Sequence, residues 1–230
     1  FVVTVIIQSS TATTVMVVGF VNAGMMTLAQ AVGVIMGANI GTTVTSLLIA
    51  LNFSSVAAAS VLVGVILMLA SKKTLVKNLG SIFTGFGLLF LCIDLMSDSM
   101  APLRESAGFM NFIVAVSDSP LRPLFGILLG IVMTAVLQSS SASVGVLQTL
   151  AMQGLVPLKF SVFVLFGQNI GTCLTALFST VGAKKNSKRA AVIHLLFNLL
   201  GTGMFILIAL LTPYIEWIEK ISSDPMAQIA

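Results

Sequence analysis

The sequence has little charge for its length. Only 8% of its 230 residues are Asp, Glu, Lys or Arg, whereas 57% are hydrophobic. Soluble domains carry about a quarter charged residues, so this composition predicts an integral membrane protein. A polar–apolar alternation typical of strands is also missing, and Gly, Ala, Leu and Met are abundant, which favours helices over a β-barrel. We therefore expect an all-α membrane protein with the lipid bilayer as a partner.

Residues that carry enzyme chemistry are scarce as well. The chain has one His and two Cys, and Cys92 and Cys173 both lie in apolar segments without metal-ligand spacing. No nucleophile–base pair or metal cluster stands out, so the sequence does not predict an enzyme.

The net charge of +4 comes mainly from two short basic clusters. Nucleic-acid binding is one interpretation, but basic loops between apolar segments are more often signals of cytoplasmic orientation. We expect the loops at 72–77 and 184–189 to be cytoplasmic, and we expect no nucleic-acid partner. The basic residues are Lys72, Lys73, Lys77, Lys184, Lys185, Lys188 and Arg189.

An internal repeat is the strongest signal in the chain. Gln8-Ser9-Ser10 recurs as Gln138-Ser139-Ser140, and Asn39-Ile40-Gly41-Thr42 recurs as Asn169-Ile170-Gly171-Thr172, each 130 residues later. The register holds without a gap, because Thr4, Gly24, Leu28 and Thr45 also match Thr134, Gly154, Leu158 and Thr175. Duplication with interrupted helices at matching positions indicates a transporter site.

Each Gln-Ser-Ser stretch lies between apolar arms that are too short to span a bilayer. Polar backbone at membrane depth is tolerated only where protein buries it or where it lines a cavity. We therefore predict a re-entrant helical hairpin in each repeat, with the polar residues at its tip.

The repeat register defines the domain organisation. Repeat 1 covers 1–101, with a hairpin at 1–19, a broken helix at 27–51 and spans at 56–70 and 79–96. A linker covers 102–120. Repeat 2 covers 121–230, with a hairpin at 121–150, a broken helix at 156–181 and a span at 190–211. Each broken helix is predicted to unwind at its Gly-Thr pair, because glycine is costly inside a continuous helix. The chain starts inside an apolar run, so we expect it to be truncated at both ends.

The charges favour opposite orientations of the two repeats. The loop at 52–55 is uncharged, whereas its equivalent at 184–189 carries four positive residues. If the repeats are inverted, all seven basic residues listed above fall on one side of the membrane. We predict two inverted-topology repeats in a multi-pass protein.

Hydroxyl side chains and free backbone N–H groups at the start of a helix are typical of anion sites. Oxygens of Gln, Asn and Thr are suitable ligands for sodium. No Arg or Lys falls in the middle of a predicted span, so sodium would have to neutralise much of an anion's charge. The competing interpretation is structural, since Ser, Thr, Gln and Asn also join membrane helices while Gly permits close packing.

Two other polar features have structural interpretations by default. Asp94 is expected to be an interfacial acid rather than an ion ligand. His194 and Asn198 lie four residues apart on one helix face and predict an interhelical hydrogen bond.

The doubled Gln-Ser-Ser and Asn-Ile-Gly-Thr motifs, together with His194-Leu195-Leu196-Phe197-Asn198, resemble the type II sodium–phosphate cotransporters, specifically their bacterial relatives. The resemblance covers nearly the whole chain. It implies sodium-coupled import of inorganic phosphate across the inner (cytoplasmic) membrane by movement of the hairpin domain, with sodium and phosphate as the transported partners.

Carried over to this sequence, the resemblance places phosphate at Ser9, Ser10, Thr11, Ser139, Ser140 and Ser141. It places sodium near Gln8, Gln138, Asn39, Asn169, Thr42, Thr172, Thr45 and Thr175. Two departures matter. Cys173 stands where a second Thr is usual, and the segment at 59–64 lacks the His and Asp of animal members, so the sodium stoichiometry cannot be borrowed.

Two alternatives stay open. One keeps the architecture but carries another oxyanion or a dicarboxylate, which would need the two tips farther apart. The other is a non-transporting membrane anchor or sensor. The sequence leaves open whether the protein forms a homo-oligomer.

Overall fold

A computed structural model describes all residues, 1–230, and every regular element in it is helical. The all-α prediction is therefore confirmed. Four helices are long and apolar enough to cross a membrane: α3 (Leu28–Ala50), α5 (Thr74–Met100, continued by η1, Ala101–Arg104), α9 (Leu158–Phe178) and α10 (Lys185–Leu211).

Shorter helices complete the chain. The first repeat adds α1 (Val2–Ile7), α2 (Ser10–Ala23) and α4 (Ser54–Ala70). Residues predicted as a linker contain α6 (Ala107–Asp118). The second repeat adds α7 (Arg122–Leu137), α8 (Ser140–Met152), α11 (Tyr214–Ile221) and α12 (Pro225–Ile229). By position in the repeat, α1, α2 and α3 correspond to α7, α8 and α9.

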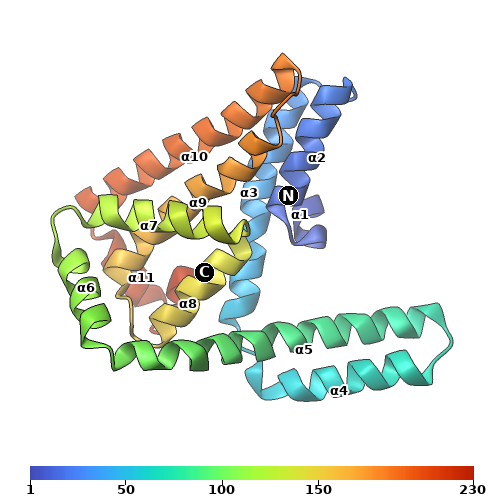
Figure 1. Cartoon of the computed structure of the whole chain (residues 1–230), viewed down its shortest axis with the longest axis horizontal. Coiled ribbons are helices and arrows are strands. Elements are labelled where there is room, and N and C mark those ends of the chain that lie inside the picture. Colours follow the sequence, from blue (N-terminus) through green and yellow to red (C-terminus); the bar gives the residue numbers. More distant parts are fainter.

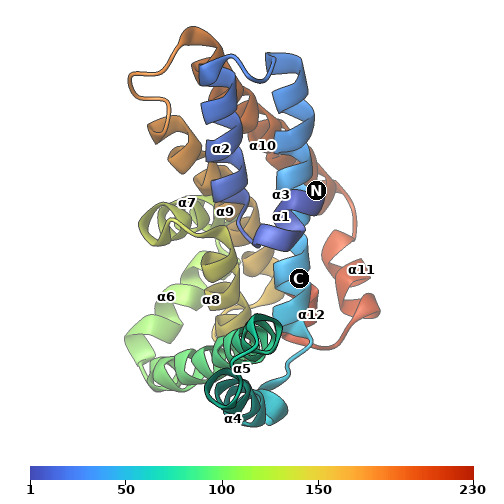
Figure 2. The same ribbon diagram turned by 90° about the vertical axis from the view of Figure 1, so that its right-hand side faces the viewer.

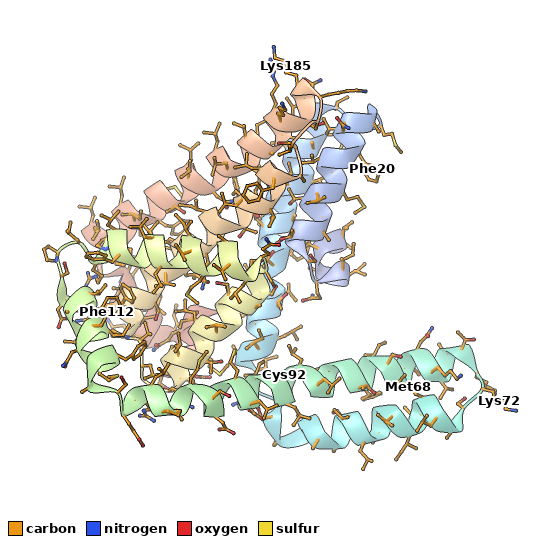
Figure 3. All side chains as sticks on the ribbon, viewed as in Figure 1. Phe20, Met68, Lys72, Cys92, Phe112 and Lys185 are labelled. Carbon is orange, nitrogen blue, oxygen red and sulfur yellow. The ribbon has the colours of Figure 1, made fainter.

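The helices form a packed body with one projecting arm (Figure 1). In the arm, α4 and α5 pack against each other through glycines, because a Cβ on Gly64 would lie 2.6 Å from the Gly80 carbonyl oxygen. The basic residue Lys72 lies at the tip of this arm, whereas Lys185 lies at the start of α10 (Figure 3). The largest apolar core cluster lies in the body, around α6, α8 and α9.

The two repeats exchange contacts across the body. Helix α2 packs on α9, and its equivalent α8 packs on α3 (Figures 1 and 2). A two-fold axis generates reciprocal contacts of this kind, whereas a translation would repeat a contact in one direction only.

The predicted breaks in the two long helices are wrong. Both α3 and α9 are continuous through Gly41 and Gly171, and α9 ends at Phe178. These glycines serve close packing instead. A Cβ on Gly41 would lie 2.7 Å from Thr4 Cβ, and one on Gly171 would lie 2.8 Å from Thr134 Cβ. A small residue at such a contact lets two helix backbones approach closely, so unwinding is not needed to explain it.

Candidate functional site

Each Gln-Ser-Ser motif interrupts the chain between two helices in the same way. Gln8 ends α1 with φ 57° and ψ 28°, and Gln138 ends α7 with φ 53° and ψ 20°. A positive φ is uncommon for a residue other than glycine and is strained, so it is often found where function requires it. The next residues, Ser9 and Ser139, are extended and cap α2 and α8. We call residues 8–11 tip one and residues 138–141 tip two.

The capping chemistry is repeated as well. The Ser9 hydroxyl accepts from the Ala12 N–H at 3.1 Å, and the Ser139 hydroxyl accepts from the Ala142 N–H at 3.2 Å. Such caps stabilise a helix start by about 1 kcal/mol each.

A pair of hydroxyls behind each tip joins the two helices that flank it. Thr4 donates to Thr13 at 3.2 Å, and Thr134 donates to Ser143 at 3.0 Å, and all four residues are buried. These residues had no predicted role. A signal was present in the sequence, because each bond partner has a hydroxyl residue 130 positions later, Thr134 for Thr4 and Ser143 for Thr13.

The two tips meet in space. The hydroxyls of Ser10 and Ser140 lie 3.5 Å apart, and the tips share a cavity of about 340 Å³. We call it the tip cavity. All six residues expected to contact phosphate line it, together with both glutamines: Gln8, Ser9, Ser10, Thr11, Gln138, Ser139, Ser140 and Ser141, with Ala12 and Val15.

No charged side chain lines the tip cavity. Its positive potential comes from the N-termini of α2 and α8, where the first backbone N–H groups have no helical partner. Each helix start stabilises an anion by at most about 2 kcal/mol. The lining can therefore bind an anion by hydrogen bonds but offers it no buried cation.

The four threonines at matching positions of α3 and α9 make two kinds of hydrogen bond. Thr45 donates to the Gln8 side-chain oxygen at 2.5 Å and so joins α3 to tip one. The hydroxyls of Thr42, Thr172 and Thr175 donate to carbonyls of their own helices. A hydroxyl that donates in this way keeps lone pairs for a cation.

The two motif asparagines lie in a separate cavity. Asn39 and Asn169 line a space of about 450 Å³ between α3, α9 and α10. This space shares no lining residue with the tip cavity. Asn39 donates to Asn198 at 2.9 Å, and its side-chain oxygen lies 3.2 Å from His194 Nε2. The predicted interhelical hydrogen bond of His194 and Asn198 is thus confirmed, and its partner is a motif residue.

Tip two has one further support that the sequence analysis missed. Buried Gln168 donates to the Ser143 carbonyl at 3.0 Å. The corresponding residue of repeat 1 is Ala38, which cannot make this bond. In the sequence, the only sign of this bond was that Ala38 and Gln168, which precede the matching asparagines, differ.

Asp94 lies away from both cavities and accepts from the Ser54 hydroxyl at 2.7 Å. Residues that line the tip cavity and the asparagine cavity do not include it.

Comparison with known proteins gives consistent family matches. The chain matches the Na+/Pi-cotransporter family over residues 1–98 and 107–219. It is 34% identical over 225 residues to "Uncharacterized protein YqeW" of Bacillus subtilis, which covers 98% of this chain and 71% of that protein. It is 28% identical over 200 residues to "Putative inorganic phosphate export protein YjbB" of Escherichia coli, which covers 87% of this chain and 36% of that protein.

A human relative is more distant. "Sodium-dependent phosphate transport protein 2B" is 26% identical over 144 residues, or 60% of this chain and 21% of that protein. The chain therefore spans about a third or less of these last two relatives. No solved structure matches it.

Proposed function

The chain belongs to the Na+/Pi-cotransporter family, and we propose that it carries inorganic phosphate with sodium ions across the cytoplasmic membrane. The observation that supports this most is the meeting of the two tips around one cavity. Its lining of hydroxyls, amides and helix starts suits a small oxyanion.

Phosphate binds between the tips in this proposal. The hydroxyls of Ser10 and Ser140, which face each other, would donate to two of its oxygens. The hydroxyls of Thr11 and Ser141 and the free N–H groups of both helix starts would serve the others. Ser9 and Ser139 hold the helix starts in place and can also donate, because a capping hydroxyl accepts through its oxygen and keeps its proton.

Sodium supplies the charge that the lining lacks. Two helix starts offer roughly 4 kcal/mol together at most, which is little for a desolvated divalent anion. The oxygens of Gln8, Gln138 and Thr45 lie at the tips or bond to them and would hold one cation beside phosphate. Asn39 and Asn169 would hold another in their own cavity, with Thr42, Thr172 and Thr175 contributing from the same two helices.

Alternating access follows if the two-fold axis lies in the membrane plane. The reciprocal packing of α2 on α9 and α8 on α3 supports two inverted repeats whose re-entrant tips meet near the midplane. In this orientation the basic segments at 72–77 and 184–189, which the structure places mainly at the starts of α5 and α10, face the cytoplasm.

We propose import, because an inward sodium gradient drives sodium-coupled substrate inward. The Escherichia coli relative is named for export, so the direction needs its own measurement. A dicarboxylate is a poorer cargo for the tip cavity, since tips whose hydroxyls lie 3.5 Å apart converge on one small ion rather than two separated carboxylates.

The test is uptake of radioactive phosphate into proteoliposomes, with and without an inward sodium gradient. Ser140→Ala removes one facing hydroxyl, and Ser223→Ala is the matched control, because Ser223 is exposed and lies outside the tip cavity. We expect sodium-dependent uptake that falls about tenfold or more in Ser140→Ala, from loss of a hydrogen bond to a charged group, and stays unchanged in Ser223→Ala.

Other outcomes identify the alternatives. Sodium-driven flux of sulfate or a dicarboxylate without phosphate uptake would show that the cargo is wrong. Phosphate uptake only under an outward sodium gradient would show exchange of phosphate for sodium, which an inward sodium gradient would drive as export, and would overturn symport. Absence of flux for every anion, with intact folded protein, would favour a membrane anchor or sensor.

A further inference from the structure

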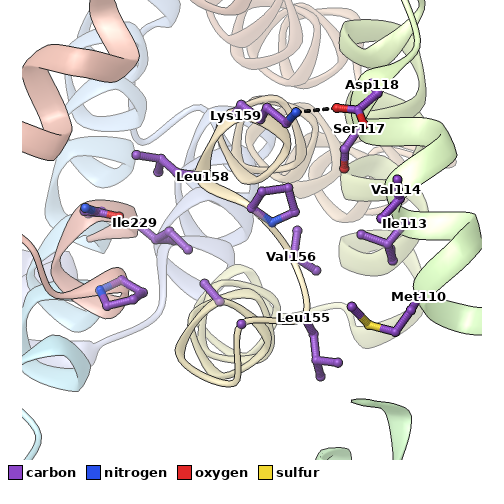
Figure 4. Close-up of a pocket in the computed structure, with 15 residues that line it drawn as sticks. Met110, Ile113, Val114, Ser117, Asp118, Leu155, Val156, Leu158, Lys159 and Ile229 are labelled. Carbon is purple, nitrogen blue, oxygen red and sulfur yellow. Dashed lines mark hydrogen bonds and ion pairs between the residues drawn. The ribbon is translucent and has the colours of Figure 1, made fainter. Parts of the chain in front are cut away.

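A third cavity, of about 430 Å³, lies at the other end of α8 from tip two. The tip cavity is at the N-terminus of α8, and this one is at its C-terminus, about 18 Å along a 13-residue helix. Its walls come from α6, the connection from α8 to α9, and α12 (Figure 4). We call it the α6 cavity. Its volume is within the range typical of small-molecule sites.

The walls of the α6 cavity are apolar. Ile113 on α6, Leu155 and Val156 before α9, and Ile229 on α12 are each at most 5% exposed and belong to the largest core cluster. A ligand must therefore present an apolar portion to them.

One side of the α6 cavity is polar and incompletely paired. Ser117 is 2% exposed, lines the cavity, and its hydroxyl has no hydrogen-bond partner. Native structures pair most buried hydroxyls, so an unpaired one calls for a partner that the protein does not supply. Beside it, Lys159 and Asp118 form an ion pair that is partly exposed (Figure 4).

We propose that the α6 cavity binds a zwitterionic phospholipid through part of an acyl chain and the adjoining ester. The apolar walls accept the alkyl segment, and the Ser117 hydroxyl donates to an ester carbonyl. The Lys159–Asp118 pair offers one charge of each sign, which complements a headgroup that also carries one of each. Lys159 lies in the first turn of α9, a candidate span, so the pair is placed where headgroups lie.

Such a lipid would add contacts between α6 and the packed pair of α8 and α12. It would touch α6, the end of α8 and α12 at once. Since α8 starts at tip two, the lipid would steady the helix that carries half of the tip cavity. The site itself does not depend on phosphate being the cargo.

The experiment uses the full chain in phosphatidylcholine nanodiscs with a trace of photoactivatable lipid. Two probes carry the same acyl chains with a diazirine near the ester, one with a choline and one with a glycerol headgroup. Crosslinks are mapped by mass spectrometry, and labelling of the α6 cavity is divided by labelling of exposed apolar residues elsewhere in the chain.

Val114→Trp and Phe112→Trp form a matched pair on α6. Val114 lines the α6 cavity and is 53% exposed, so a larger side chain obstructs the cavity without disturbing the core. Phe112 is 59% exposed and does not line it.

We expect the choline probe to label the α6 cavity several-fold above exposed sites. Val114→Trp should abolish this excess, Ser117→Ala should lower it about fivefold, in line with one lost hydrogen bond, and Phe112→Trp should leave it unchanged. Equal labelling of cavity and exposed sites would overturn the proposal, and so would an excess that survives Val114→Trp. Stronger labelling by the glycerol probe would overturn the headgroup assignment.

Discussion

Tip one and tip two have nearly the same backbone but different supports. Gln8 and Gln138 differ by only 4° in φ, from 57° to 53°. Tip one is held to α3 by the bond from Thr45 to Gln8. At tip two, Gln168 of α9 instead bonds to the Ser143 carbonyl behind the tip.

Burial shows the same asymmetry. In the apolar window of α9, 67% of residues are buried inside the protein, compared with 28% in α3. Local geometry at a tip is thus encoded by the motif, while the contacts that hold a tip depend on the helices around it. Four predictions test this comparison.

The largest effect should come from the contact that the tips share. Ser10→Ala and Ser140→Ala should each lower kcat/KM for phosphate uptake about tenfold. Because the two hydroxyls are in contact, the double variant should lose less than the product of the single losses. Initial uptake rates for all four proteins complete this cycle. Fully multiplicative losses would mean that the tips act independently and that the shared cavity does not bind one ion.

The packing glycine of α9 should give the next largest effect. A Cβ on Gly167 would lie 2.1 Å from the Ile127 carbonyl oxygen, with two more backbone atoms at 2.8 Å. We expect Gly167→Ala to destabilise the protein by about 1–3 kcal/mol.

Thermal unfolding in detergent measures this loss of stability. Gly201→Ala is the control, because nothing lies within 4 Å of a Cβ at that position. It should leave the melting temperature unchanged or raise it slightly, since Ala favours a helix over Gly. A Gly167→Ala protein that melts at the same temperature as Gly201→Ala would show that the contact between α7 and α9 does not require a small residue at position 167.

Removing the extra support of tip two should have a smaller effect. Gln168→Met keeps the volume but deletes the donor to the Ser143 carbonyl, so we expect KM for phosphate to rise about threefold to tenfold. Ser161→Ala is the control, because Ser161 is a buried residue near the start of the same helix, and its hydroxyl bonds to Pro157. A KM that rises equally in both variants would indicate general loosening of α9 instead.

The smallest effect should distinguish the matching threonines. Thr45→Val removes the bond to Gln8, whereas Thr175→Val removes a bond within α9. We expect the sodium concentration for half-maximal uptake to rise about threefold to fivefold in Thr45→Val and less than about twofold in Thr175→Val. Uptake measured over a range of sodium concentrations gives both values. An equal rise would show that Gln138 is held by Thr175 during transport as Gln8 is by Thr45.

Several features followed from the sequence because they depend on local patterns. Sparse charge and long apolar runs determine a helical membrane protein, and the 130-residue register determines which residues are equivalent. A Gln-Ser-Ser stretch between apolar arms ends one helix and caps the next, because Ser is a strong N-cap. The repeat marked the two tips, and the resemblance to the type II sodium–phosphate cotransporters named the candidate phosphate residues within them.

Other features depended on tertiary contacts. Gly41 and Gly171 predicted breaks, but the approach of α1 and α7 gives them a packing role, and a continuous helix keeps its backbone hydrogen bonds. The asparagines lie apart from the tips, Gln168 supports tip two, and the α6 cavity forms between several helices. Each of these features depends on residues that are far apart in the chain. Sequence periodicity gives the face on which a residue lies, whereas only the packed structure decides what that face meets.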